Sequence, residues 1–276
     1  MRLSGMSPKY AHLLDRTVRY LEAGSGRTCI LIHAFPLSAD QWLPQLARVP
    51  QGWRFVAPDV RGFRGIGQAY QDVGLDQATM ATHAADVLQL MSHLDVDTAV
   101  IGGVSMGGYV AMAVAKAAPR RLDGLVLADT RATADTDEGR AGRDAMIAKV
   151  RADGVSVVAD AMLPKLIGES SKREQPDLTD AVRELIMRNT PEAVVSALAA
   201  MKARPDSTEV LAQLECPSLV VCGEEDVITP MTDSESMAAT LRHSTLVRIP
   251  RAGHLSNLEA PLVFNEALGR FLNGLT

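Results

Sequence analysis

The chain has 276 residues, of which 47% are hydrophobic, and this is enough to bury the core of one α/β domain that carries an insertion. A formal net charge of -5, without runs of Lys or Arg among aromatic residues, argues against a nucleic-acid partner. No apolar stretch reaches the roughly 18 residues that a membrane-spanning helix needs, and the first residues lack the apolar core of a secretory signal. We therefore expect a cytoplasmic protein with no membrane partner.

The first half of the chain alternates short apolar runs with longer segments of helical periodicity. This alternation is typical of a mostly parallel sheet that helices cover on both faces. The turn Gly24-Ser25-Gly26 indicates that the first two predicted strands are neighbours, and Trp42, Leu43 and Leu46 indicate a helix after the second. The predicted strands are Thr17 to Ala23, Thr28 to Ala34, Arg54 to Val60, Thr98 to Val104 and Leu122 to Asp129.

The strand that ends at Val104 is followed almost at once by a helix. The segment from Gly107 to Ala118 is rich in Ala, Val and Met and stops before Pro119, so it predicts a buried helix. An earlier helix is predicted over Thr79 to Leu94, where apolar residues recur at three- and four-residue steps. The sequence therefore places a strand, a sharp turn and a helix in immediate succession.

After the fifth predicted strand the composition becomes charged and helical, without a convincing β run. This change predicts an inserted helical cap over residues 131–206, between two parts of a core domain, 1–130 and 207–276. The predicted cap helices are Glu138 to Ala152, Val155 to Leu163, Asp177 to Met187 and Pro191 to Ala203. The core resumes with strands Ser218 to Gly223 and Thr245 to Ile249 and a helix from Pro261 to Leu272.

The sharp turn carries the pattern Gly-x-Ser-x-Gly, here Gly103-Val104-Ser105-Met106-Gly107. A Ser at the apex of such a turn exposes its hydroxyl, and the flanking glycines let strand and helix approach closely. The helix that begins here directs free amides and the positive end of its dipole at the site. The pentapeptide alone also fits an ordinary turn. Its position between strand and helix predicts that Ser105 is a nucleophile and that the amide of Met106 is an oxyanion donor.

A serine nucleophile needs a base that takes its proton and a carboxylate that orients the base. Asp226 and His254 each lie just beyond a predicted strand, where open α/β sheets bind ligands. The order Ser, acid, His is the one found in the hydrolase architecture that uses this serine turn. We predict Asp226 as the acid, with Glu224 or Glu225 as alternatives, and His254 as the base.

The loop after the strand Thr28 to Ala34 has to supply the second oxyanion amide. We assign this amide to Phe35, and we expect His33 to order the loop rather than to carry a proton. The other histidines have no catalytic pattern nearby: His12, His83, His93 and His243. The cysteines lie in or beside apolar runs typical of reduced, buried thiols: Cys29, Cys216 and Cys222. No Cys or His pair has the close spacing of a metal site, so we expect no metal and no cofactor.

Several short motifs accompany these candidate residues. They are His33-Ala34-Phe35-Pro36, Pro58-Asp59-Val60-Arg61-Gly62, Gly103-Val104-Ser105-Met106-Gly107-Gly108, Gly223-Glu224-Glu225-Asp226 and Gly253-His254. Over nearly the whole chain they resemble the α/β-hydrolase superfamily, and within it small bacterial 3-oxoadipate enol-lactonases and carboxylesterases. The resemblance implies an α/β-hydrolase fold with a helical cap and a triad of Ser105, Asp226 and His254.

Two features depart from the usual pattern of that superfamily. Ala34 stands where the oxyanion loop usually has Gly, and the stretch from Arg61 to Gly67 looks like an altered Arg-Gly-x-Gly-x-Ser loop. Ser105 at the nucleophile position argues against relatives with an Asp nucleophile, the haloalkane dehalogenases and epoxide hydrolases.

We therefore expect a serine hydrolase that cleaves a small carboxylic ester or lactone through an acyl-enzyme on Ser105. The alternatives are a carbon-carbon bond hydrolase or a perhydrolase of the same fold, and a non-catalytic ligand receptor. We expect the cap to select the substrate. Its basic residues either anchor a substrate carboxylate or, more commonly, form solvated helix faces: Arg131, Arg140, Arg143, Lys165, Lys172 and Arg173. The sequence leaves open whether the protein forms a homo-oligomer.

Overall fold

The computed structural model describes residues 6–64 and 78–275, and these form an 8-stranded sheet of order β1-β2-β4-β3-β5-β6-β7-β8. Strands β4, β3 and β5 to β8 are parallel to one another, whereas β2 is antiparallel to both β1 and β4. The predicted mostly parallel sheet is confirmed. The strands are β1 (Lys9–His12), β2 (Thr17–Gly24), β3 (Arg27–Ile32), β4 (Trp53–Pro58), β5 (Ala99–Val104), β6 (Leu122–Ala128), β7 (Ser218–Gly223) and β8 (Ser244–Ile249).

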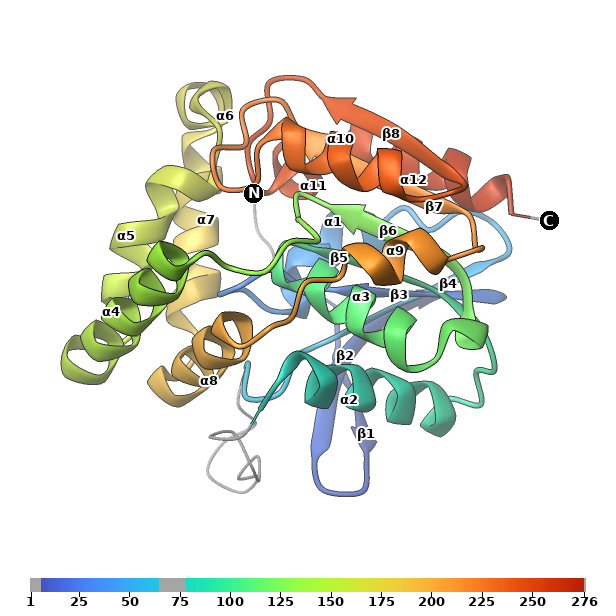
Figure 1. Cartoon of the computed structure of the whole chain (residues 1–276), viewed down its shortest axis with the longest axis horizontal. Coiled ribbons are helices and arrows are strands. Elements are labelled where there is room, and N and C mark those ends of the chain that lie inside the picture. The colour runs from blue at the N-terminus through green and yellow to red at the C-terminus, as the bar shows by residue number, and fades with distance from the viewer. Residues whose placement is uncertain (1–5, 65–77, 276) are drawn as a thin grey trace.

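Helices cover the sheet, and every residue of β5 and β7 is buried, as expected of parallel strands packed on both faces. Figure 1 shows α2 and α3 packed side by side against the sheet. The helices are α1 (Leu43–Leu46), α2 (Met80–His93), α3 (Met106–Ala117), α4 (Asp137–Asp153), α5 (Ser156–Leu166), α6 (Glu169–Glu174), α7 (Pro176–Met187), α8 (Pro191–Lys202), α9 (Thr208–Gln213), α10 (Met231–Thr240), α11 (Ser256–Glu259) and α12 (Pro261–Asn273). None of the helices within the described ranges is long and apolar enough to cross a membrane.

The expectation that the first two predicted strands are neighbours is wrong. Strand β4 lies between β2 and β3 and pairs with both, antiparallel to β2 and parallel to β3. The glycine turn passes close to the start of β4, because a Cβ on Gly24 would lie 2.3 Å from the carbonyl oxygen of Trp53, and one on Gly26 only 2.1 Å from that of Gly52. The glycines thus allow a close backbone crossing. A local turn pattern cannot reveal a strand that arrives later in the chain.

The segment between β6 and β7 is helical, as predicted. Helices α4 to α8 gather at one side of the sheet (Figure 1). This segment contacts the loop after β3 and helix α11: the Asn189 side-chain amide donates to the carbonyl of Pro36 at 2.8 Å, and the Gly168 amide donates to the Glu259 carboxylate at 2.8 Å. Its role as a cap over residues 131–206 stays a prediction.

Candidate active site

Ser105 forms the turn between β5 and α3 with a strained backbone. Its φ of 54° and ψ of -114° lie in a region that residues with side chains rarely adopt. A Cβ on Gly107 would lie 2.1 Å from the carbonyl oxygen of Ile32 on β3, and a Cβ on Gly103 would lie 2.1 Å from the carbonyl carbon of Gly107. Both glycines are therefore required by the close approach of strand and helix, which is the sharp turn that the motif predicts.

The end of β6 braces this turn from the other side. The amide of Ser105 donates to the carbonyl of Ala128 at 2.9 Å, and the Thr130 hydroxyl donates to the carbonyl of Ser105 at 2.8 Å. A side chain at position 108 would collide with Thr130, because a Cβ on Gly108 would lie 2.6 Å from the Thr130 hydroxyl oxygen. The strained turn is thus held by hydrogen bonds on the neighbouring strand, which keep its conformation fixed.

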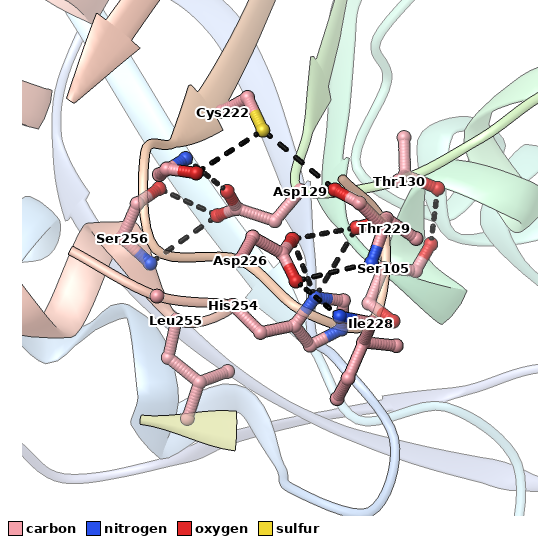
Figure 2. Close-up of polar contacts among 12 residues, drawn as sticks. Ser105, Asp129, Thr130, Cys222, Asp226, Ile228, Thr229, His254, Leu255 and Ser256 are labelled. Atoms are coloured by element: carbon pink, nitrogen blue, oxygen red, sulfur yellow. Dashed lines mark hydrogen bonds and ion pairs between the residues drawn. The ribbon is translucent and has the colours of Figure 1, made fainter. Parts of the chain in front are cut away.

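Asp226 and His254 form a buried pair at the ends of β7 and β8. The Nδ1 of His254 lies 2.8 Å from Oδ2 of Asp226, with 1% and 0% of the two side chains exposed (Figure 2). Because a carboxylate accepts, Nδ1 carries the proton and Nε2 is left to accept one. This is the tautomer that a general base facing a serine requires.

The Asp226 carboxylate is surrounded by donors. Its Oδ1 accepts the amides of Ile228 at 2.8 Å and Thr229 at 3.0 Å, and its Oδ2 accepts the Thr229 hydroxyl at 2.6 Å. Burial raises the pKa of Asp226, but the charge and hydrogen bond of His254, together with Thr229, outweigh it and hold this pKa below its usual range. Asp226 is therefore ionised at neutral pH.

The two neighbouring carboxylates, which were the alternative acids, point elsewhere. Glu224 is exposed, and Glu225 accepts the amide of Ser170 at 2.8 Å and its hydroxyl at 2.5 Å. Only Asp226, of these three, is paired with His254. The geometry therefore favours Asp226 over both glutamates.

Ser105 lies at the same edge of the sheet as this pair, since β5, β6, β7 and β8 are consecutive parallel strands that end there. Figure 2 shows Ser105 in one cluster with Asp226 and His254. Across the described residues, no hydrogen bond joins the Ser105 hydroxyl to the His254 ring. Such a bond is often long before substrate binds and tightens in the complex. The structure thus joins Asp226 and His254 directly and places Ser105 beside them.

The two predicted oxyanion amides lie at neighbouring strand ends. Met106 is the first residue of α3, after β5, where amides have no partner within the helix, and Phe35 lies in the loop after β3. The departure at Ala34 is accommodated, because this residue is fully buried and its amide donates to Oε1 of Gln41 at 2.7 Å.

His33 orders this loop, in agreement with the sequence. Its Nδ1 lies 2.9 Å from the carbonyl of Ala34, and its Nε2 accepts the amide of Val60 at 3.0 Å. These contacts specify a neutral ring with the proton on Nδ1. Burial lowers the pKa of His33 to about 4, so it stays neutral at physiological pH.

The altered Arg-Gly loop is described only in part, because residues 65–67 lie outside the described residues. Arg61, at its start, is 4% exposed and pairs with Asp86 at 2.7 Å and with Asp15 at 3.0 Å. This arginine holds the loop to α2 and to the turn after β1.

Sequence reasoning missed Asp129, a fully buried carboxyl at the end of β6. It accepts the amide of Gly223 at 2.8 Å and the hydroxyl of Ser256 at 2.5 Å, so it joins the two loops that carry Asp226 and His254. Burial, followed by the nearby charge of Asp226, raises the pKa of Asp129 well above its usual range. Ligand atoms of Asp129, Cys222 and Asp226 lie within 4.8 Å of one another, but protein donors already occupy both carboxylates. The one sequence signal for Asp129 is its position directly after a central strand, where polar residues of a site are expected.

The sheet order, the serine turn and the buried acid and base define an α/β hydrolase. The family model described as alpha/beta hydrolase fold matches residues 28–261, and the chain belongs to this family. It is similar to 3-oxoadipate enol-lactonase 2 of Acinetobacter baylyi, with 25% identity over 92% of each chain. Among solved structures it resembles a thermophilic esterase from Thermogutta terrifontis (36% identity, 98% and 99% of the two chains, TM-score 0.90) and the enol-lactonase from Burkholderia xenovorans LB400 (25%, 96% and 100%, TM-score 0.86).

Proposed function

We propose that this protein is a serine hydrolase that cleaves a small carboxylic ester or lactone, with Ser105 as nucleophile, His254 as base and Asp226 as acid. The observation that carries the proposal is the buried 2.8 Å pair of Asp226 and His254 at the sheet edge where the strained Ser105 turn lies. Esterases and enol-lactonases among the relatives of the chain support the same reaction class.

In the first half of the reaction, the Ser105 oxygen attacks the acyl carbon while its proton passes to Nε2 of His254. The carbonyl electrons move to the oxygen, and the amides of Phe35 and Met106 donate to this oxyanion. When the carbon-oxygen bond of the ester breaks, His254 returns the proton to the departing alkoxide. Asp226 stays ionised and stabilises the imidazolium throughout, which its low pKa favours.

In the second half, a water molecule gives a proton to His254 and attacks the acyl-enzyme carbon. The bond to Ser105 then breaks, and His254 returns the proton to the serine oxygen. A lactone follows the same steps, except that its alcohol and acid leave as one molecule.

The substrate class is narrowed by the basic residues of the segment between β6 and β7. Most of the candidate anchors for a substrate carboxylate already have acidic partners: Arg140 pairs with Asp137, Arg143 with Asp135, Lys172 with Glu169 and Arg173 with Glu174. These pairs leave these four cations without an unmatched charge for a substrate carboxylate. We therefore propose uncharged small esters and lactones as the first substrates to test.

The test compares wild type with S105A on p-nitrophenyl esters of increasing acyl length and on a panel of simple lactones. We expect turnover in wild type and a loss of several orders of magnitude in S105A. After rapid quenching, the intact mass of wild type should show an acyl adduct that S105A lacks. Turnover by S105A within tenfold of wild type would refute the assignment. Stable binding of these compounds without product release would instead support a receptor.

A further inference from the structure

Glu259, at the end of α11, has a buried side chain that collects backbone amides from two distant segments. Only 4% of the surface of Glu259 is exposed. Oε2 accepts the amide of Gly253 at 2.9 Å, and Oε1 accepts the amide of Leu255 at 3.1 Å. Oε2 also accepts the amide of Gly168, which precedes α6, at 2.8 Å. One carboxylate therefore binds the chain on both sides of His254 and a residue of the segment between β6 and β7.

These contacts fix the position from which the imidazole extends. The peptide groups before and after His254 set the direction of its Cα–Cβ bond, so holding both amides leaves the ring little freedom except rotation about its own side-chain bonds. The 2.8 Å contact of Nδ1 with Asp226 then selects one of those rotations. Ionised carboxylates offer only acceptors and thus match a set of N–H donors.

The third amide adds a close backbone contact. A Cβ on Gly253 would lie 2.4 Å from the amide nitrogen of Gly168, so the chain before His254 and the start of α6 touch directly. A separate carboxylate, that of Glu225, accepts the amide of Ser170 at 2.8 Å. The backbone amide of Glu225 donates to the carbonyl of Ala252 at 2.8 Å, but the Glu225 carboxylate makes no hydrogen bond to the His254 loop among the described residues. The start of α6 is thus held by two carboxylates, and of these two only that of Glu259 also accepts the amides beside His254.

We propose that Glu259 is a positioning residue for His254, which fixes the backbone on both sides of the base and ties it to the start of α6. This inference rests on the proposed role of His254 as the general base. Glu259 does not need to contact substrate, since it acts through the direction of the imidazole.

The test compares E259Q and E259D with E225Q, a matched control at the other glutamate. In E259Q an NH2 group must face a backbone N–H, and E259D keeps the charge but shortens its reach by one methylene. We expect both variants to lower kcat by roughly 10- to 100-fold with little change in KM, since small misplacements of a catalytic group have effects of this size. E225Q should keep kcat within about twofold, because it loosens α6 without touching the amides beside His254.

A second measurement needs no substrate. The proton on Nδ1 of His254, shared with Asp226, should give a low-field proton NMR signal in S105A, which keeps both partners. We expect that signal to shift or broaden when E259Q or E259D is added to S105A, and to stay in place with E225Q. If wild type hydrolyses no ester or lactone but the signal responds in this way, the positioning role stands and the proposed function fails.

Equal losses of kcat in E259Q, E259D and E225Q, or an unchanged signal in both Glu259 variants, would overturn the proposal. Such results would make Glu259 a structural anchor only. Thermal unfolding shows whether each variant is folded before kcat and the NMR signal are measured. If E259Q does not fold, the comparison of E259D with E225Q decides the outcome.

Discussion

The Oδ2 of Asp226 lies 2.8 Å from Nδ1 of His254, and almost no surface of either side chain reaches solvent. Removing one partner of a buried, hydrogen-bonded pair leaves an uncompensated group in a medium of low polarity. The backbone amides and the hydroxyl around Asp226 reduce that cost for the carboxylate, because they satisfy it independently of the imidazole. The pair is therefore organised before substrate arrives.

Replacing Asp226 by Asn should lower kcat by about four orders of magnitude. The amide NH2 of Asn would donate to Nδ1, so the ring proton would move to Nε2, which could no longer accept the Ser105 proton. The kcat on an activated ester measures this loss. E224Q, at an exposed neighbour, is the control and should keep wild-type activity. A D226N enzyme within tenfold of wild type would return the acid role to one of the glutamates.

Thr229 should stabilise the folded protein through its hydrogen bond to the Asp226 carboxylate. Its hydroxyl is fully buried and donates to Asp226 at 2.6 Å, so T229V removes a hydrogen bond to a charged group while nearly keeping the shape. We expect the free energy of unfolding to fall by about 2 kcal/mol in urea denaturation. T240V, at the half-buried end of α10, loses only a solvent-exposed hydrogen bond to the carbonyl of Ser236 and should change it far less. Equal stability of T229V and wild type would show that the backbone amides suffice for Asp226.

Replacement of two different glycines by Ala should have opposite effects on the free energy of unfolding. A Cβ on Gly107 would lie 2.1 Å from the Ile32 carbonyl oxygen, so G107A should lower the free energy of unfolding by several kcal/mol. Gly142, in α4, has no atom within 4 Å of that position, and G142A should stabilise the protein by up to about 1 kcal/mol. Thermal unfolding measures both changes. A tolerated G107A would mean that α3 shifts away from β3 easily.

His33 should make stability depend on pH in the acidic range. Burial lowers its pKa to about 4 from an ordinary value of 6.5, so between these values the unfolded chain binds a proton that the folded chain refuses. Its contribution is full above pH 6.5 and is lost as the pH falls toward 4, by on the order of 3 kcal/mol. Urea denaturation across this range should show a shallower pH dependence in H33N. His83 titrates in both proteins, so its effect cancels; parallel curves would contradict the prediction.

Much of the candidate site could be predicted because its residues lie in short sequence motifs next to strands. Ser105 lies in a pentapeptide between a strand and a helix, and Asp226 and His254 each follow a strand closely. These short-range signals also set the fold class. The alternative acids could not be separated on the same basis, since Glu224, Glu225 and Asp226 are consecutive and only side-chain direction distinguishes them.

The residues that sequence reasoning missed act over long separations. Asp129 binds Gly223 and Ser256, and Glu259 reaches Gly168, so none of these contacts follows from a repeat or a spacing. The insertion of β4 between β2 and β3 has the same origin, because the intervening strand comes from later in the chain. Tertiary packing decides each of these features, and contacts between distant residues cannot be predicted from a single sequence.

The place of Asp129 between the two halves of the chain bears on the order of folding. β6 and β7 are adjacent in the sheet, yet residues 131–206 and α9 separate them in the sequence. During synthesis the serine turn and Asp129 emerge well before Gly223 and Ser256, which later supply the hydrogen-bond donors for the Asp129 carboxyl. Until β7 and β8 dock, that carboxyl must stay hydrated, and the end of β6 stays unfinished. Docking of the last strands therefore closes the core and brings Asp226 and His254 together, so this pair forms only after β7 and β8 have joined the sheet.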